Sequence, residues 1–153
     1  MKRHLAYLKY VLRHKWFVFI ASYKIKASLW RAIIHDMSKF LPSEWSPYVR
    51  TFYKPDGSKQ YNESEEFNVA WNYHQKRNKH HYQYWILFCD DGREIPMKMP
   101  KKYVKEMAAD WIGAGRACTG NWNHVKLWYE KRKDRIPIHN DTKIYIEKVI
   151  EEW

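Results

Sequence analysis

The amino-acid sequence predicts an all-α fold of about six or seven helices, in one domain that covers residues 1–153. Apolar residues recur every three or four positions along most of the chain, which is the period of a helix with one buried face. Serine, asparagine, aspartate and proline precede several of these segments, and these residue types favour the start of a helix. The hydrophobic fraction of 45% is enough for one core at this length.

The first predicted helix covers residues 3–23. One side of it carries an apolar stripe at helical spacing, which consists of Leu5, Leu8, Leu12, Trp16 and Phe19. Basic residues lie on the opposite side. His14 lies off the basic side, in a row with Tyr7, Val11 and Val18, so we expect its side chain to point into the protein.

The second predicted helix begins after Ser28, whose hydroxyl can cap it. Its apolar residues are expected to face inward, and they are Leu29, Trp30, Ile33, Ile34 and Met37. Arg31, His35 and Lys39 repeat every four residues and share another face. His35 and Asp36 point about 100° apart on a helix, so both can touch one metal only if the metal lies beside the helix, between them.

The third predicted helix runs from Ser43 to about Tyr53, and a loop rich in turn-forming residues follows it. The fourth helix begins at Asn62 or Ser64, where several glutamates suit the positive end of the helix dipole. It carries His74 on its apolar face.

The last part of the chain contains a turn signal and three more helices. Residues 83–99 hold the sequence DDG between two short apolar segments, which predicts either a short β-hairpin or an irregular loop. Pro100 opens the fifth helix, on which Asp110 shares a row with apolar residues. The remaining helices cover residues 122–133 and the segment from residues 140–141 to the C-terminus.

The formal net charge of +11 favours a polyanionic partner, such as nucleic acid or a small phosphate-containing molecule. The basic residues are spread along the chain, so a charge that only keeps the protein soluble is an open alternative. Cys89 and Cys118 form no CxxC pair, which argues against a disulfide scaffold and fits a reducing cytoplasm. The apolar stretch at residues 16–23 is too short for a bilayer, so we expect no membrane contact.

Imidazoles and carboxylates recur at positions that could converge in space. The segment HQKRNKHH places the doublet His80-His81 after a helix exit at Asn78, so its imidazoles and that of His74 can approach from two directions. This mixture of ligands suits a divalent metal. Each element also has a simpler interpretation: a core histidine for His14, a salt bridge for Asp110, and a solvated basic turn for HQKRNKHH. The metal-site hypothesis depends on all of them together.

The order of these residues resembles that in the HD superfamily of metal-dependent phosphohydrolases. The most similar branch has an HDxGK motif and a later HH doublet, and it includes the HD-GYP phosphodiesterases; here Ser38 stands at the glycine position and no GYP triplet follows. The chain also resembles an uncharacterised bacterial and phage family over roughly residues 10–118. The shared motifs are HDMSK, HQKRNKHH, Tyr84-Trp85 and EMAADWIGAG. The resemblance implies a compact HD-like helical domain in the cytoplasm of a bacterium or of a phage-infected cell.

The resemblance also implies two divalent ions of iron, manganese or zinc. The ligands that it implies are His14, His35, Asp36, His74, His80, His81 and Asp110. Asp36 would bridge the ions and Lys39 would meet the phosphate, so these two are the expected catalytic residues. Arg31 and Arg77 are candidate substrate clamps, because a guanidinium grips phosphate with two hydrogen bonds. The expected reaction is hydrolysis of a phosphoester bond in a nucleotide or oligonucleotide by a metal-bound hydroxide.

Three other functions are compatible with the sequence. Some HD-fold proteins use the same ligands to hold two irons that activate oxygen. A non-catalytic protein could bind single-stranded nucleic acid through basic residues interleaved with tryptophan and tyrosine. A basic phage protein that acts through its surface is the third alternative.

Overall fold

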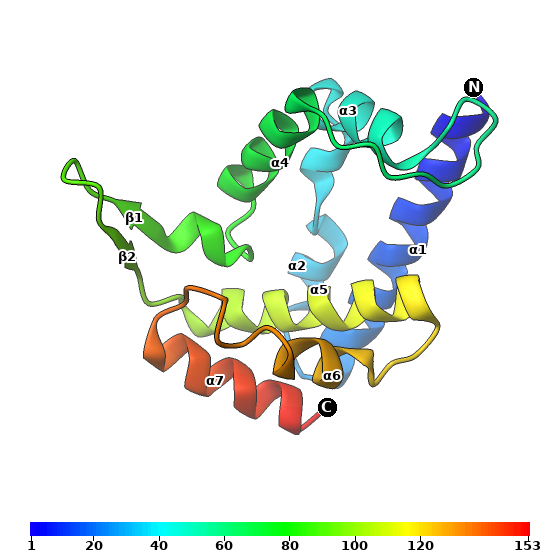
Figure 1. Ribbon diagram of the computed structural model, residues 1–153. Helices are drawn as coiled ribbons and strands as arrows, with labels where there is room; N and C mark the ends of the chain where they lie inside the picture. Colours follow the sequence, from blue (N-terminus) through cyan, green and yellow to red (C-terminus); the bar gives the residue numbers. More distant parts are fainter.

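Two long helices, α1 (Lys2–Lys24) and α5 (Lys101–Thr119), cross at close range and organise the fold. The computed structural model describes residues 1–153. At the crossing a Cβ atom on Gly113 would lie 2.7 Å from Val18 Cγ2 and 2.8 Å from the Val18 backbone nitrogen. Only glycine therefore permits this approach. Figure 1 shows α3 and α4 toward one end of the molecule and α5 to α7 toward the other, with α1 reaching both.

Seven α-helices, two short 3₁₀ helices and one hairpin make up the chain, which confirms the predicted all-α fold. The remaining elements are α2 (Leu29–Ile34), η1 (Met37–Phe40), α3 (Pro42–Phe52), α4 (Glu65–Arg77), η2 (Tyr82–Trp85), β1 (Ile86–Phe88), β2 (Glu94–Pro96), α6 (His124–Glu130) and α7 (Asn140–Glu151). The antiparallel hairpin pairs Leu87 with Ile95, so the hairpin alternative for residues 83–99 is correct. No helix has the length and apolar character needed to cross a bilayer.

Helix starts follow the capping residues that the sequence offers. Ser28 Oγ accepts a hydrogen bond from the Arg31 backbone N–H, and Ser64 Oγ accepts one from the Phe67 N–H. Pro42 occupies the first turn of α3. The two serine caps fix where α2 and α4 begin, whereas α3 has no side-chain cap and starts with a first-turn proline.

Two apolar clusters form the core, and α1 contributes to both. The larger one packs α1 against α5, α6 and α7 and includes Val18 and Ala21. The smaller one packs α1 against α3 and α4 and includes Tyr7 and Val11. His14 lies between these two pairs on the same buried face of α1 and is 2% exposed. The prediction that His14 points inward is confirmed.

The apolar stripe predicted for α1 is not its buried face. Leu12 and Trp16 are 54% and 59% exposed, because α1 packs through the neighbouring row, whose residues allow close approach to α5. The inward orientation predicted for α2 is also wrong. Trp30 and Ile33 are 67% and 53% exposed, and only Ala32 of this short helix is buried.

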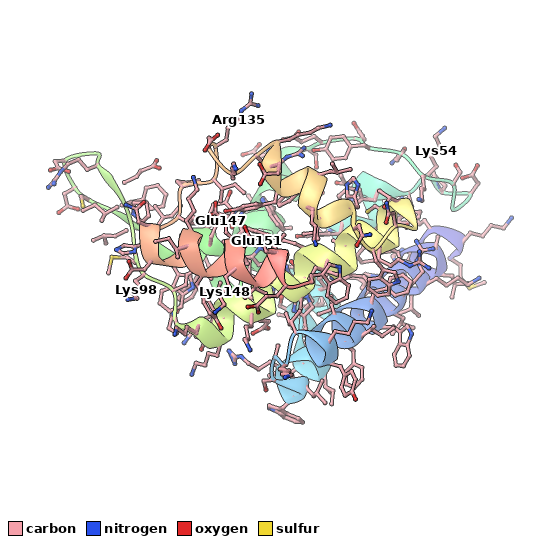
Figure 2. The ribbon with its side chains drawn as sticks, turned by 90° about the horizontal axis from the view of Figure 1, so that it is seen from below. Lys54, Lys98, Arg135, Glu147, Lys148 and Glu151 are labelled. Carbon is pink, nitrogen blue, oxygen red and sulfur yellow. The ribbon has the colours of Figure 1, made fainter.

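The positive charge is distributed over the surface. The labelled side chains of Lys54, Lys98 and Arg135 in Figure 2 lie at separate edges of the molecule. On α7, Lys148 stands beside two glutamates, Glu147 and Glu151.

Candidate metal centre

The His35-Asp36 pair lies in a break of the chain rather than on a continuous helix. Helix α2 ends at Ile34, and η1 begins at Met37. Between them Asp36 has left-handed backbone angles, φ 57° and ψ 23°, which aspartate tolerates better than most residues. The predicted helix through Lys39 is therefore wrong. The break frees the two side chains from helical spacing, and both are buried, with His35 1% and Asp36 2% exposed.

The first group of candidate ligands joins this break to α1 and α5. His14 Nε2 lies 3.1 Å from Asp110 Oδ1 and 3.6 Å from Asp36 Oδ2. His35 Nε2 lies 3.4 Å from Asp110 Oδ1 and 3.3 Å from Asp36 Oδ2. Ligand atoms of all four residues lie within 4.8 Å of one another, so one ion between them could contact each.

The second group joins Asp36 to α4 and the loop that follows it. His74 Nε2 and His80 Nε2 lie 3.2 Å and 3.3 Å from Asp36 Oδ1. His81 completes this group of four, whose ligand atoms also lie within 4.8 Å of one another. Asp36 therefore turns Oδ2 to the first group and Oδ1 to the second.

The buried polar atoms of these groups fit metal ions. The Nε2 atoms of all five histidines lack a hydrogen-bond partner, as does Asp36 Oδ1; the histidines are His14, His35, His74, His80 and His81. Buried polar atoms nearly always have a partner, and a coordinated cation satisfies imidazole and carboxylate lone pairs together. This donor set suits zinc, iron or manganese. The cluster could therefore hold metal ions, and it contains every ligand residue that the sequence resemblance implied.

Glu44 contacts the ring nitrogen of His74 that does not face Asp36. It is fully buried, and its Oε2 accepts a 2.8 Å hydrogen bond from His74 Nδ1. This bond leaves Nε2 of His74 as the atom with a free lone pair. Burial raises the pKa of Glu44, but hydrogen bonds from His74 and Arg77 outweigh burial and hold this pKa below its ordinary value.

Glu106 supports one histidine of each group. Its Oε1 lies 3.6 Å from His35 Nδ1 and 3.3 Å from His80 Nδ1. Burial raises the pKa of Glu106, but the adjacent imidazoles outweigh burial and lower this pKa to about 2. The three residues form a further group that could contact a cation. Sequence reasoning missed Glu106, although its position one turn before Asp110 on the same helix was a usable signal.

Arg31 and Arg77, the predicted substrate clamps, each contact a carboxylate beside the ligand groups. Arg31 Nε lies 3.0 Å from Glu106 Oε2, and its guanidinium covers the Tyr103 ring at 4.2 Å. Arg77 donates a 2.7 Å hydrogen bond to Glu44 Oε1. Each arginine thus holds a carboxylate that in turn contacts the histidines, which is a positioning role.

Lys39 contacts the centre of the cluster. Its Nζ donates a 2.6 Å hydrogen bond to Asp36 Oδ2. Burial lowers the pKa of Lys39, but the charge of Asp36 outweighs burial and raises this pKa above its ordinary value. A fixed positive charge therefore lies beside the shared carboxylate.

In the absence of metal, the close contacts between imidazoles and carboxylates shift the pKa values of both kinds of group. Burial lowers the pKa of His35, but the charge of Asp36 and contacts with Asp110 and Glu106 raise it well above its ordinary value. Burial raises the pKa of Asp110, but the imidazoles of His14 and His35 lower it well below its ordinary value. Carboxylates are thus ionised, and at least one imidazole carries a proton that a metal must displace.

A sequence model described as DUF5662, a family of unknown function, matches residues 3–152. No curated protein and no solved structure matches the chain.

Proposed function

The chain belongs to the DUF5662 family, and we propose that it is a metal-dependent hydrolase that cleaves a phosphoester bond in a nucleotide-type substrate. One observation carries the proposal: Asp36 lies between two groups of buried ligands and offers one oxygen to each. Sites that hold a metal pair around a shared ligand are common among enzymes that cleave phosphoesters.

Each group would hold one ion. His14, His35 and Asp110 would complete the first site with Asp36, and His74, His80 and His81 would complete the second. When bound, a metal pair supplies activation of water at neutral pH and neutralisation of charge on the phosphoryl oxygens. In the reaction the water oxygen bonds to phosphorus, the ester oxygen leaves, and the leaving oxygen gains a proton.

The chain's own groups orient this site and add charge. Glu44 holds the ring of His74 through a hydrogen bond at Nδ1, and Glu106 places a negative charge beside Nδ1 of His35 and His80. Lys39 keeps an ammonium next to Asp36, where it favours an anionic phosphoryl group and stabilises the charge that develops on it.

Metal content tests the proposal directly. We expect about two equivalents of metal in untagged protein by elemental analysis, consistent with a two-metal site. His35→Ala and Asp110→Ala should lose metal, whereas His124→Ala, outside all three groups, should retain it. The loaded protein should cleave p-nitrophenyl phosphate or bis(p-nitrophenyl) phosphate, and a chelator should abolish cleavage. Wild-type protein without metal after reconstitution would contradict the proposal.

A second candidate is an enzyme that activates oxygen at two irons. The buried histidine and carboxylate ligands that favour hydrolysis also suit iron. Optical and Mössbauer spectra of protein purified from iron-rich medium distinguish the hydrolase from the oxygen-activating enzyme. Only the oxygen-activating enzyme requires the iron to change its oxidation state upon exposure to oxygen.

A further inference from the structure

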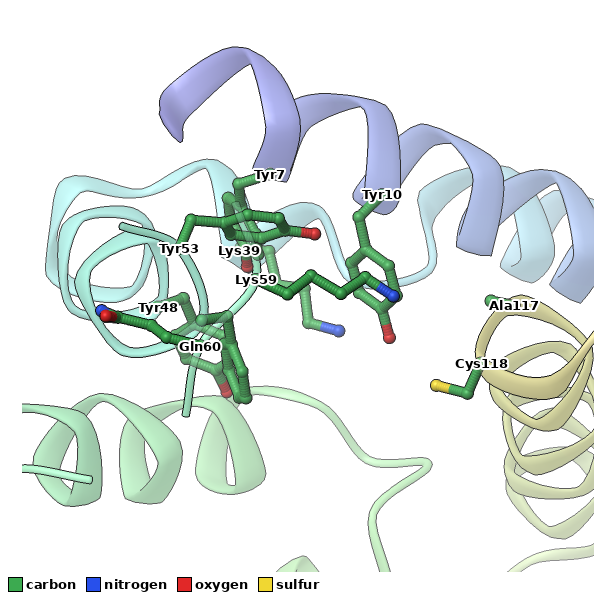
Figure 3. Close-up of a pocket in the computed structure, with 10 residues that line it drawn as sticks. Tyr7, Tyr10, Lys39, Tyr48, Tyr53, Lys59, Gln60, Ala117 and Cys118 are labelled. Carbon is green, nitrogen blue, oxygen red and sulfur yellow. The ribbon is translucent and has the colours of Figure 1, made fainter. Parts of the chain in front are cut away.

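A cavity lined by tyrosines adjoins the candidate metal centre. It has a volume of about 290 Å³ and lies between α1, α3, the loop after α3 and the end of α5. Four tyrosines and two lysines contribute to its lining; they are Tyr7, Tyr10, Tyr48, Tyr53, Lys39 and Lys59. Figure 3 shows these side chains converging on one space that faces Ala117 and Cys118 of α5.

Two of the tyrosine hydroxyls lack a partner. Tyr7 and Tyr48 are 1% and 5% exposed, and neither hydroxyl has a hydrogen-bond partner in the protein. A buried hydroxyl without a partner is costly, so such groups usually meet a ligand or ordered water. A phenol hydroxyl can donate a hydrogen bond to a ligand. Two residues of the cavity lining therefore carry a hydroxyl that has no partner within the protein.

Residues of the cavity lining contact both ligand groups. The Tyr10 ring stacks on His14 of the first group, with centroids 6.2 Å apart and planes inclined by 9°. The Tyr48 ring packs edge-on against His74 of the second group, with centroids 6.1 Å apart. Lys39 lines the cavity and touches Asp36, which both groups share. None of the candidate metal ligands lines the cavity itself, so a molecule in it lies next to the metal centre, with the side chains of Tyr10, Tyr48 and Lys39 between them.

The charge of the lining selects an anion. Two lysines and no carboxylate line the cavity. Lys39 is at the buried end and uses one of its three N–H donors on Asp36, which leaves two for a ligand. Lys59, from the loop after α3, also lines the cavity and is exposed. The aromatic side chains of the lining suit a planar ring.

We propose that this cavity binds the substrate and takes a small organic phosphate with a planar ring, of the size of a mononucleotide. Its phosphate lies toward Lys39 and the metal centre, and its ring lies between the tyrosines. The volume is close to the lower limit of about 300 Å³ for small-molecule sites, so an oligonucleotide cannot be enclosed. The assignment of the reacting end rests on the proposed function.

Calorimetric titration of metal-loaded protein with adenosine 5′-monophosphate tests the cavity. Tyr7→Phe and Tyr48→Phe remove one hydroxyl each and keep the ring, and each should weaken binding by about tenfold. Tyr23→Phe is the matched control, because Tyr23 is 70% exposed on α1 and does not line the cavity. The two cavity variants should unfold at the same temperature as wild type or higher, because the lost hydroxyls have no partner in the protein.

The outcomes separate this inference from the proposed function. Binding that depends on Tyr7 and Tyr48, without any cleavage of phosphoesters, would support the cavity and contradict the hydrolase. Cleavage with a KM that neither variant changes would support the hydrolase and overturn the cavity. Absence of binding to the loaded protein, or tighter binding of a ten-nucleotide single strand than of the mononucleotide, would also overturn it.

Discussion

His14 on α1 and Asp110 on α5 face each other with 3.1 Å between Nε2 and Oδ1. This distance follows from the close crossing of the two helices. Val18, one turn after His14, lies against Gly113, which comes one turn after Asp110. The packing of the core and the geometry of the first ligand group are therefore set by the same contact.

Gly113→Ala should separate the two helices and weaken metal binding. The added Cβ would meet the Val18 backbone nitrogen at 2.8 Å, so we expect a loss of about 1–3 kcal/mol in the free energy of unfolding. Urea denaturation and metal content measure the two effects. Gly115→Ala is the control, because its Cβ meets only ordinary contacts from 3.4 Å and should stabilise the helix. Equal unfolding free energies and equal metal contents in the two variants would contradict the claim that the helix crossing positions the first ligand group.

Glu44→Gln should lower metal affinity without removing a ligand. Glu44 fixes the ring of His74 through Nδ1, and loss of such a carboxylate usually costs about 10- to 100-fold in affinity. Competition with a chromophoric chelator measures the change. Glu66→Gln serves as the control, because Glu66 pairs with Arg50 on the surface. An unchanged metal affinity of the Glu44→Gln variant would contradict the claim that Glu44 positions His74.

Glu106 should make the stability of the metal-free protein depend on pH. Its pKa of about 2 in the folded protein lies below the ordinary value of 4.5. The folded state therefore gains stability from this group above pH 4.5, and loses it as the pH falls toward 2. The lowered pKa of Glu106 corresponds to on the order of 3 kcal/mol of stability.

Denaturation of chelator-treated wild type and Glu106→Gln at several pH values checks this dependence. The difference in unfolding free energy between the two proteins should be largest near pH 6 and should shrink as the pH falls below 4.5. A difference that stays constant with pH would mean that Glu106 is not ionised through its contacts with His35 and His80.

Metal uptake should release protons. The pKa values of His35 and His74 are raised in the metal-free protein, because Asp36 outweighs the effect of burial on each. A protonated imidazole cannot bind a metal, so apparent affinity should rise with pH until both rings are neutral. Calorimetry in buffers with different ionisation enthalpies counts the released protons. Uptake without proton release would contradict the described protonation.

Helices and their starting residues could be predicted from the sequence more reliably than the side of each helix that is buried. Ser28 and Ser64 act locally as caps, so the starts of α2 and α4 were visible in the chain, whereas α3 begins at Pro42, one residue before the predicted Ser43, and has no side-chain cap. The buried face of α1 was not visible in the chain, because the close crossing with α5 selects the row with Val18 and leaves Trp16 outside. Hydrophobic periodicity identifies a helix, but tertiary contacts decide which side it buries.

The residues of the candidate site could be predicted from the sequence, but their arrangement in space could not. The resemblance implied seven of the eight residues that the structure brings together in the three groups, and Glu106 is the eighth. The left-handed backbone of Asp36 could not be read from HDMSK, because a helix through this segment is locally plausible. Glu44 was also out of reach, since an acidic residue in the first turn of a helix normally serves the helix dipole.

Anomalous X-ray scattering from crystals of protein loaded with manganese tests the central claim most directly. The shared position of Asp36 predicts two peaks, one beside Oδ2 with His14 and His35, and one beside Oδ1 with His74 and His80. Paired metals of this kind lie about 3.5–4 Å apart. A single peak that does not contact Asp36, or no peak in this cluster, would contradict the two-metal account.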